Sequence, residues 1–189
     1  MFVMYGWLAL LLWGFASAKG VRLSSSLGLS PGHAWPAIEQ AFIGYLAVFP
    51  WIMAILWGIV AVCQQLGIQP PLEPIHELLF EERSPLVLGL TVALACILGP
   101  LTEEVLFRGL VFSALRRRVS RPAAMLISGS LFSAAHTNLV GFLPILLLGC
   151  FLADCYERSG SLWASIAVHM FHNTVLIGMA LTVKALLQS

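Results

Sequence analysis

The chain has 189 residues, of which 59% are hydrophobic and only 10% are charged, and its mean hydropathy is +0.91. A soluble domain is about a quarter charged, and so few ionic groups could not cover this much apolar surface in water. The net charge of +1 gives no reason to expect a nucleic-acid partner, and the length suits one helical bundle in a lipid bilayer.

A membrane-spanning helix needs about 20 mostly apolar residues. The predicted spans, in chain order, are residues 1–18, 38–66, 85–115, 122–137, 142–156 and 162–181. The first is interpreted as a span and not as a cleaved signal peptide, because no Lys or Arg precedes its apolar stretch. The sequence therefore predicts an all-α, polytopic transmembrane bundle of about six helices, in a single domain 1–189 whose motif-bearing core is about 85–182.

The charged loops divide by sign. Lys and Arg follow the first, third and fifth spans, at residues 19–22, 116–121 and 158, whereas the acidic segment 73–82 follows the second. An excess of Lys and Arg marks the cytoplasmic side, so we expect the 116–121 loop to be cytoplasmic. The acidic segment is expected to be an external loop with one short interfacial helix.

Two further features concern the spans themselves. The third contains Gly99-Pro100, which is expected to interrupt and kink it, because Pro100 has no N–H to donate to the carbonyl of Cys96. The cysteines lie in or beside apolar runs without a CxxC pair, so we interpret them as small buried hydrophobes in preference to disulfides or metal ligands.

Ionisable side chains are expensive in hydrocarbon and usually face a cavity or one another. The candidate site residues found by this criterion are Glu103, Glu104, Arg108, His136, His169 and Asn173. Counted at about 1.5 Å per residue from the flanking arginines, the groups on the third, fourth and sixth spans lie at comparable depth. We therefore expect these separate helices to form one polar intramembrane cavity.

Helical spacing suggests different roles for the two adjacent glutamates. Glu104 and Arg108 are four residues apart and can pair along one face, whereas Glu103 points in another direction. Glu103 is then available to act as a base. His169 and Asn173 are also four apart and share a face of the sixth span.

Peptide hydrolysis needs a water molecule, a base that activates it, and donors for the developing oxyanion. Glu103 can accept the proton of the water, and His136 can orient the same water. His169 and Asn173 can donate to the oxyanion. The residue types therefore favour a peptidase.

These residues carry a family resemblance. EEVLFRG at 103–109, FSAAH at 132–136 and HMFHN at 169–173 resemble the EExxxR, FxxxH and HxxxN motifs of the CPBP family, the CAAX-protease and bacteriocin-processing (Abi) proteins. RSGSLW at 158–163 is similar to the stretch that leads into the last motif. The resemblance covers about residues 100–173, and its specificity comes from three weak motifs that occur in order.

The resemblance implies an intramembrane glutamic endopeptidase with a cavity open to one side. Glu103 and His136 would hold the water, His169 and Asn173 would stabilise the oxyanion, and Glu104 and Arg108 would pair. The family then implies a membrane-embedded or lipidated protein or peptide substrate, with no required cofactor. His172 lies outside the motif and is interpreted as structural.

The cellular role stays open at this point. Eukaryotic members of the family act on prenylated CAAX proteins, whereas small members like this one are typically bacterial, which implies the inner membrane. Their roles include bacteriocin maturation, self-immunity, and trimming of anchored C-terminal sorting segments. The composition does not choose among these roles.

Three alternatives to a glutamate-dependent peptidase are considered. The polar groups could only hold helices together. Two glutamates and three histidines could bind a catalytic zinc, although HExxH is absent and a His–Asn pair suits donation better than ligation. A proton-coupled transporter or channel also uses buried Glu and Arg, but no internal repeat is visible.

Overall fold

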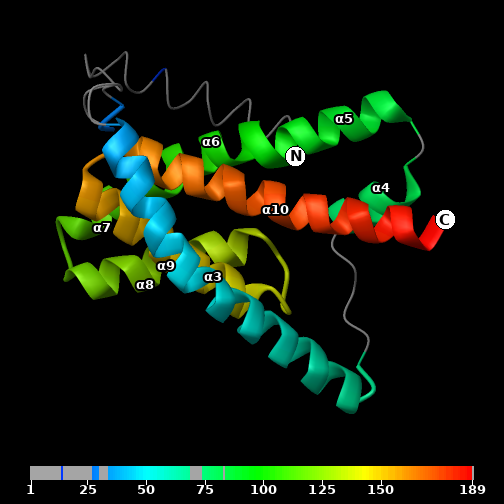
Figure 1. The fold of residues 1–189 in the computed structure, drawn as a ribbon. Helices are drawn as coiled ribbons and strands as arrows, with labels where there is room; N and C mark the ends of the chain where they lie inside the picture. The colour runs from blue at the N-terminus through cyan, green and yellow to red at the C-terminus, as the bar shows by residue number, and fades with distance from the viewer. Residues whose placement is uncertain (1–13, 15–26, 30–33, 69–73, 83, 189) are drawn as a thin grey trace.

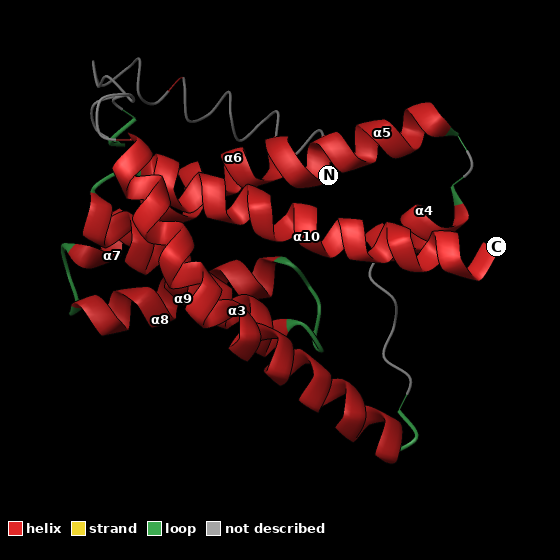
Figure 2. Ribbon diagram, in the orientation of Figure 1, coloured by secondary structure: helices red, strands yellow, loops and turns green. Residues whose placement is uncertain are grey.

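The computed structural model describes residues 14, 27–29, 34–68, 74–82 and 84–188 (Figure 1). All regular structure in these residues is helical (Figure 2), which confirms the predicted all-α class. The predicted first span, residues 1–18, lies outside the described residues except for one position.

The helices follow the predicted spans closely. They are α3 (Ala34–Gln65), α4 (Pro74–Glu81), α5 (Pro85–Ala93), the π-helical η2 (Leu94–Leu98), α6 (Gly99–Glu104), the π-helical η3 (Val105–Phe112), α7 (Ser113–Arg116), α8 (Arg121–Ala135), α9 (Phe142–Ser159) and α10 (Leu162–Gln188). The segments from α5 to α7 form one continuous helical stretch, Pro85–Arg116. The short α4 is the helix expected in the acidic loop.

Among the described helices, three are long and apolar enough to cross a membrane: α3, the stretch Pro85–Arg116, and α10. The predicted fourth and fifth spans are α8 and α9, with 15 and 18 residues. They do not reach the same combination of length and hydropathy. To span a bilayer, these two short helices would require local thinning.

The expected interruption at Gly99-Pro100 takes the form of a π-helical turn. Helix η2 immediately precedes the pair, and the N–H of Gly99 bonds to the carbonyl of Leu94, five residues back. Pro100 then lies in the first turn of α6, where a missing N–H is tolerated. The chain thus accommodates the proline by widening one helical turn, without ending the helix.

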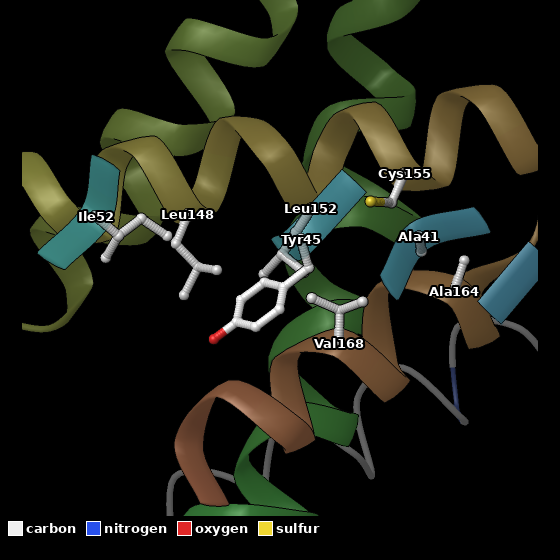
Figure 3. Close-up of a cluster of buried hydrophobic side chains, with 8 residues drawn as sticks. All are labelled: Ala41, Tyr45, Ile52, Leu148, Leu152, Cys155, Ala164 and Val168. Atoms are coloured by element: carbon white, nitrogen blue, oxygen red, sulfur yellow. The ribbon is translucent and has the colours of Figure 1, made fainter. Parts of the chain in front are cut away.

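Helices α3, α9 and α10 enclose a buried cluster (Figure 3). Its members are apolar side chains and one tyrosine: Ala41, Tyr45, Ile52, Leu148, Leu152, Cys155, Ala164 and Val168. On its other side α9 packs closely against α8. Helix α3 therefore packs directly on α10, which carries the last motif, and reaches α8 through α9.

Two glycines bring the backbones of α8 and α9 into contact. A Cβ added at Gly149 would lie 3.0 Å from the Cα of Gly129 and 3.1 Å from the ring of Phe132. A larger side chain at Gly149 would push the Gly129 backbone or the Phe132 ring away by a few tenths of an ångström. Small residues commonly allow this close approach between membrane helices.

We expect Gly149→Ala to lower the free energy of unfolding by about 1–3 kcal/mol, the usual effect of overpacking. The matched control is Gly178→Ala in α10, where an added Cβ meets nothing within 4 Å. The control should be neutral or stabilising, because alanine is the better helix former. Thermal unfolding in detergent measures both variants, and equal behaviour would contradict the tight crossing.

The basic loops meet at one end of the bundle. Arg116 pairs with Glu157 at 2.8 Å, and Asp154 pairs with both Arg121 and Arg158. The loops after the predicted third and fifth spans therefore share an end, opposite the C-terminus of α10 (Figure 1). This agrees with the predicted alternation of spans, and the cytoplasmic assignment stays a prediction.

The RSGSLW stretch at 158–163 forms the turn between α9 and α10 and binds the segment 27–29. The N–H of Leu162 donates to the carbonyl of Leu27 at 3.2 Å. The Ser161 hydroxyl donates to the carbonyl of Gly28 at 3.0 Å. The Trp163 indole N–H bonds to the carbonyl of Leu29 at 3.2 Å. This turn thus anchors a preceding segment of the chain beside the motif-bearing helices.

Candidate active site

The structure places the first-motif pair as helical spacing predicted. Arg108 Nη1 donates to Glu104 Oε1 at 2.7 Å, and both side chains are fully buried. Arg108 Nη2 donates to the carbonyl of Gly149 on α9 at 3.0 Å. The guanidinium also stacks over the ring of Phe132, 4.5 Å from its centroid. The pair therefore ties the first-motif helix to both α8 and α9.

The two adjacent glutamates point to different sides of their helix, and His169 bridges them. Its Nδ1 lies 2.9 Å from Glu104 Oε1, and its Nε2 lies 3.8 Å from Glu103 Oε2. An ionised carboxylate only accepts hydrogen bonds, so Nδ1 is the protonated nitrogen. The buried Glu104 therefore fixes the orientation of His169 and turns its Nε2 toward Glu103.

His136 approaches the same carboxylate oxygen from α8. Its Nδ1 lies 2.8 Å from the carbonyl oxygen of Phe132, which can only accept, so Nδ1 again carries the hydrogen. Its Nε2 lies 3.8 Å from Glu103 Oε2. Glu103 thus faces one imidazole from α8 and another from α10.

The two separations of 3.8 Å are longer than a direct hydrogen bond. Access differs sharply between the two glutamates. The side chain of Glu103 is 13% exposed and that of His136 is 33% exposed, whereas Glu104 is fully buried. Only the first glutamate is therefore open to a water or a substrate.

Asn173 contacts the backbone of the first-motif helix. Its Nδ2 donates to the carbonyl of Ala95 in η2 at 2.9 Å. One of its two amide hydrogens is thereby engaged, a contact that the motif pattern did not predict. Its oxyanion role stays a prediction.

Phe132, the first residue of the second motif, packs against the polar groups of the site. Its ring is fully buried, with centroids 4.7 Å from the ring of His136 and 5.5 Å from that of His169. It also lies edge-on to Phe107, at 5.1 Å. An aromatic side chain here therefore fixes both imidazoles and the guanidinium against one apolar surface.

Sequence reasoning did not single out Tyr45 or Ser165. Tyr45 and His172 are hydrogen-bonded through the tyrosine hydroxyl and Nδ1 at 2.9 Å, and both are buried. This contact joins α3 to α10 and suits the structural interpretation of His172. Ser165 lies beside Glu104. Its position four residues before His169 could have revealed it, whereas no local signal points to Tyr45.

Within the described residues, no group of three or more His, Cys, Asp or Glu side chains is arranged to hold a metal ion. The four cysteines are free thiols; Cys96 and Cys155 are buried, as interpreted, whereas Cys63 and Cys150 are partly exposed. Metal analysis of the purified protein, together with its activity, tests the zinc alternative.

Comparison with known proteins gives a family match over the motif-bearing helices. The model described as "Type II CAAX prenyl endopeptidase Rce1-like" matches residues 85–175, which contain all six candidate residues. No solved structure matches the chain.

Three relatives share about a third of their aligned residues with the chain. "Putative membrane peptidase YdiL" of Bacillus subtilis is 33% identical over 92 residues, which are 49% of this chain and 38% of that protein. An "Uncharacterized 24.3 kDa protein" of Escherichia coli is 33% identical over 135 residues, 67% of this chain and 61% of that protein. "UPF0177 protein YxdF" of Lactococcus lactis is 34% identical over 74 residues, 39% of this chain and 40% of that protein. The matches thus span less than two thirds of each relative.

Proposed function

Because the chain belongs, through residues 85–175, to the Rce1-like family of type II CAAX prenyl endopeptidases, we propose that it is an intramembrane endopeptidase. Its substrate would be a membrane-embedded or lipidated protein or peptide. The observation that carries this proposal is the convergence of two imidazoles, from α8 and α10, on one oxygen of an accessible glutamate. Each Nε2 lies 3.8 Å from Glu103 Oε2, so both imidazoles border the place where a water bound to this carboxylate would lie.

In the proposed reaction, Glu103 takes a proton from this water while the lone pair of His136 Nε2 orients it. The water oxygen attacks the scissile carbonyl carbon, and the carbonyl oxygen becomes an oxyanion. The carbon–nitrogen bond then breaks, and the proton held by Glu103 passes to the leaving amine. Every atom comes from water and substrate, so no further reactant is needed.

His169 suits the oxyanion when its ring carries two protons. Its Nδ1–H is held by Glu104, so a second proton on Nε2 would point toward the space that Glu103 faces. In that state the two carboxylates of Glu103 and Glu104 are balanced by Arg108 and the imidazolium. A charge-balanced cluster is the arrangement that a low-dielectric environment favours.

A comparison of protein termini tests the proposed activity even while the substrate is unidentified. Membrane-protein termini are mapped in cells that carry either the unaltered chain or the Glu103→Ala variant, at matched expression. New termini should occur only with the unaltered chain and should lie in or beside apolar or lipidated segments. An identical set of termini in both strains would refute proteolysis.

The glutamate mechanism predicts that cleavage persists after metal removal. Purified protein dialysed against a strong chelator should retain its activity and contain far less than one zinc per chain. Activity that disappears with stoichiometric zinc and returns on its addition would establish the metalloprotease alternative. Proton flux in liposomes that Glu103→Gln abolishes would instead support a transporter.

The membrane location follows from three apolar helices of spanning length. We propose the inner membrane of a bacterium, with the 116–121 loop in the cytoplasm. The convergence of Arg116, Arg121 and Arg158 at one end supports this orientation through the positive-inside rule. A reporter that works only in the cytoplasm should be active when it is fused within this loop, and a reporter that works only outside the cytoplasm should be inactive there.

A further inference from the structure

The π-helical turn before Pro100 leaves one carbonyl without a backbone donor. In η2 the N–H of Gly99 bonds to the carbonyl of Leu94, five residues back. In the same register the next bond would run from residue 100 to the carbonyl of Ala95. Residue 100 is proline and has no N–H, so this bond cannot form. An orphaned carbonyl in a membrane helix needs another donor.

Asn173 supplies that donor from a different helix. Its Nδ2 lies 2.9 Å from the Ala95 carbonyl oxygen, across the contact between α10 and η2. The neighbouring carbonyls of Leu98 and Gly99 both accept from the Thr102 hydroxyl at 2.9 Å. The Thr102 hydroxyl adds to the backbone bonds of α6, whereas Asn173 supplies a donor that the backbone lacks.

The shape of this turn bears directly on Glu103. A Cβ added at Gly99 would lie 3.0 Å from the Leu94 carbonyl oxygen and 3.8 Å from Glu103 Oε1. The carboxylate therefore lies over the turn that Asn173 holds. A shift of the turn would move the carboxylate relative to both imidazoles.

We propose that Asn173 is a positioning residue: its carboxamide replaces the N–H that Pro100 lacks and so holds the π-turn that orients Glu103. The part of this inference that concerns activity rests on the proposed peptidase function. A positioning role for Asn173 differs from a direct oxyanion role in one testable respect. A positioning residue depends on what occupies position 100, whereas an oxyanion donor does not.

A double-mutant cycle on the full chain separates the two roles. Asn173→Ala, Pro100→Ala and the double variant are purified in detergent, and thermal unfolding is recorded without substrate. Asn173→Ala should lower the melting temperature by about 2–4 °C, the shift expected for one hydrogen bond in a chain of this size. With alanine at position 100, a backbone N–H can reach the carbonyl of Ala95. In that background Asn173→Ala should therefore lower the melting temperature by less than half as much.

An unchanged melting temperature for Asn173→Ala, or an equal loss in both backgrounds, would overturn the proposal. If Pro100→Ala does not fold, Asn173→Leu decides the question. Leucine has nearly the size of asparagine but cannot donate to the Ala95 carbonyl, so it should melt below the parent, as Asn173→Ala does. A melting temperature equal to that of the parent would refute the contact. The control is Thr174→Ala, whose exposed hydroxyl bonds only within α10, and it should melt like the parent.

The same variants are then assayed with a quenched-fluorescent farnesylated peptide. Asn173→Ala should reduce kcat about 100-fold, within the range for a misplaced catalytic group, and only a few-fold when residue 100 is alanine. A 100-fold loss in both backgrounds would assign Asn173 directly to the reaction. If the unaltered chain does not cleave this probe, the result bears on the proposed substrate class, and the unfolding cycle still decides the positioning role.

Discussion

Glu103→Gln is expected to abolish peptide cleavage while leaving the protein folded. Glutamine keeps the shape of the side chain but cannot take a proton from water, and a positioned general base contributes about 10²–10⁴-fold to a rate. Glu103 is partly exposed, and its oxygen lies 3.8 Å from each imidazole. The substitution leaves the buried pair of Glu104 with Arg108 and the contact of His169 with Glu104 intact. Cleavage rate and thermal unfolding in detergent measure the two halves of the prediction.

The adjacent glutamate provides a matched control with the opposite outcome. Glu104 is fully buried and accepts from Arg108 at 2.7 Å and from His169 at 2.9 Å. Glu104→Gln removes the negative charge that both donors face, so it should lower the melting temperature far more than Glu103→Gln does. A stable, active Glu103→Gln variant would contradict the assigned base. An unstable one would support a purely structural polar network.

The parts of the site that follow from local helical geometry were predictable. A separation of four residues was enough to pair Glu104 with Arg108, because neighbouring turns of one helix fix that contact. The apolar spans could likewise be recognised from the sequence alone, and so could the lack of an HExxH motif. The contact between Arg108 and Phe132, in contrast, joins two motifs and depends on how η3 packs against α8.

The contacts of the last helix were not predictable in the same way. The spacing of His169 and Asn173 showed that they share a face, but not that one would bridge two glutamates and the other would bond to Ala95. The π-turn at η2 exists where a proline, a glycine and a side-chain donor from α10 meet. A rule based on one helix expected the carbonyl of Cys96 to lose its bond, whereas the wider register transfers the loss to Ala95.

The largest loss of stability is expected from Arg108→Met. This change leaves the Glu104 carboxylate buried without its cation, and breaking such a pair on one side typically costs about 3–5 kcal/mol. It also removes the donor to the Gly149 carbonyl and the stack on Phe132. The folded fraction in detergent should fall sharply, as measured by size-exclusion chromatography and thermal unfolding.

The double variant Glu104→Gln with Arg108→Met tests whether charge is the cause. Removing both charges leaves neither member of the pair buried without its counter-charge, so the double variant should be more stable than Arg108→Met alone. Arg116→Met is the matched control, because the pair of Arg116 with Glu157 is about a third exposed on each side, 32% and 27%. Such a pair contributes about 0–1 kcal/mol. If Arg108→Met and Arg116→Met unfold alike, the buried pair does not hold the site together. If they differ as expected, inactivity of an Arg108 variant reports lost positioning of Glu104 and His169, since Arg108 itself faces no reacting atom.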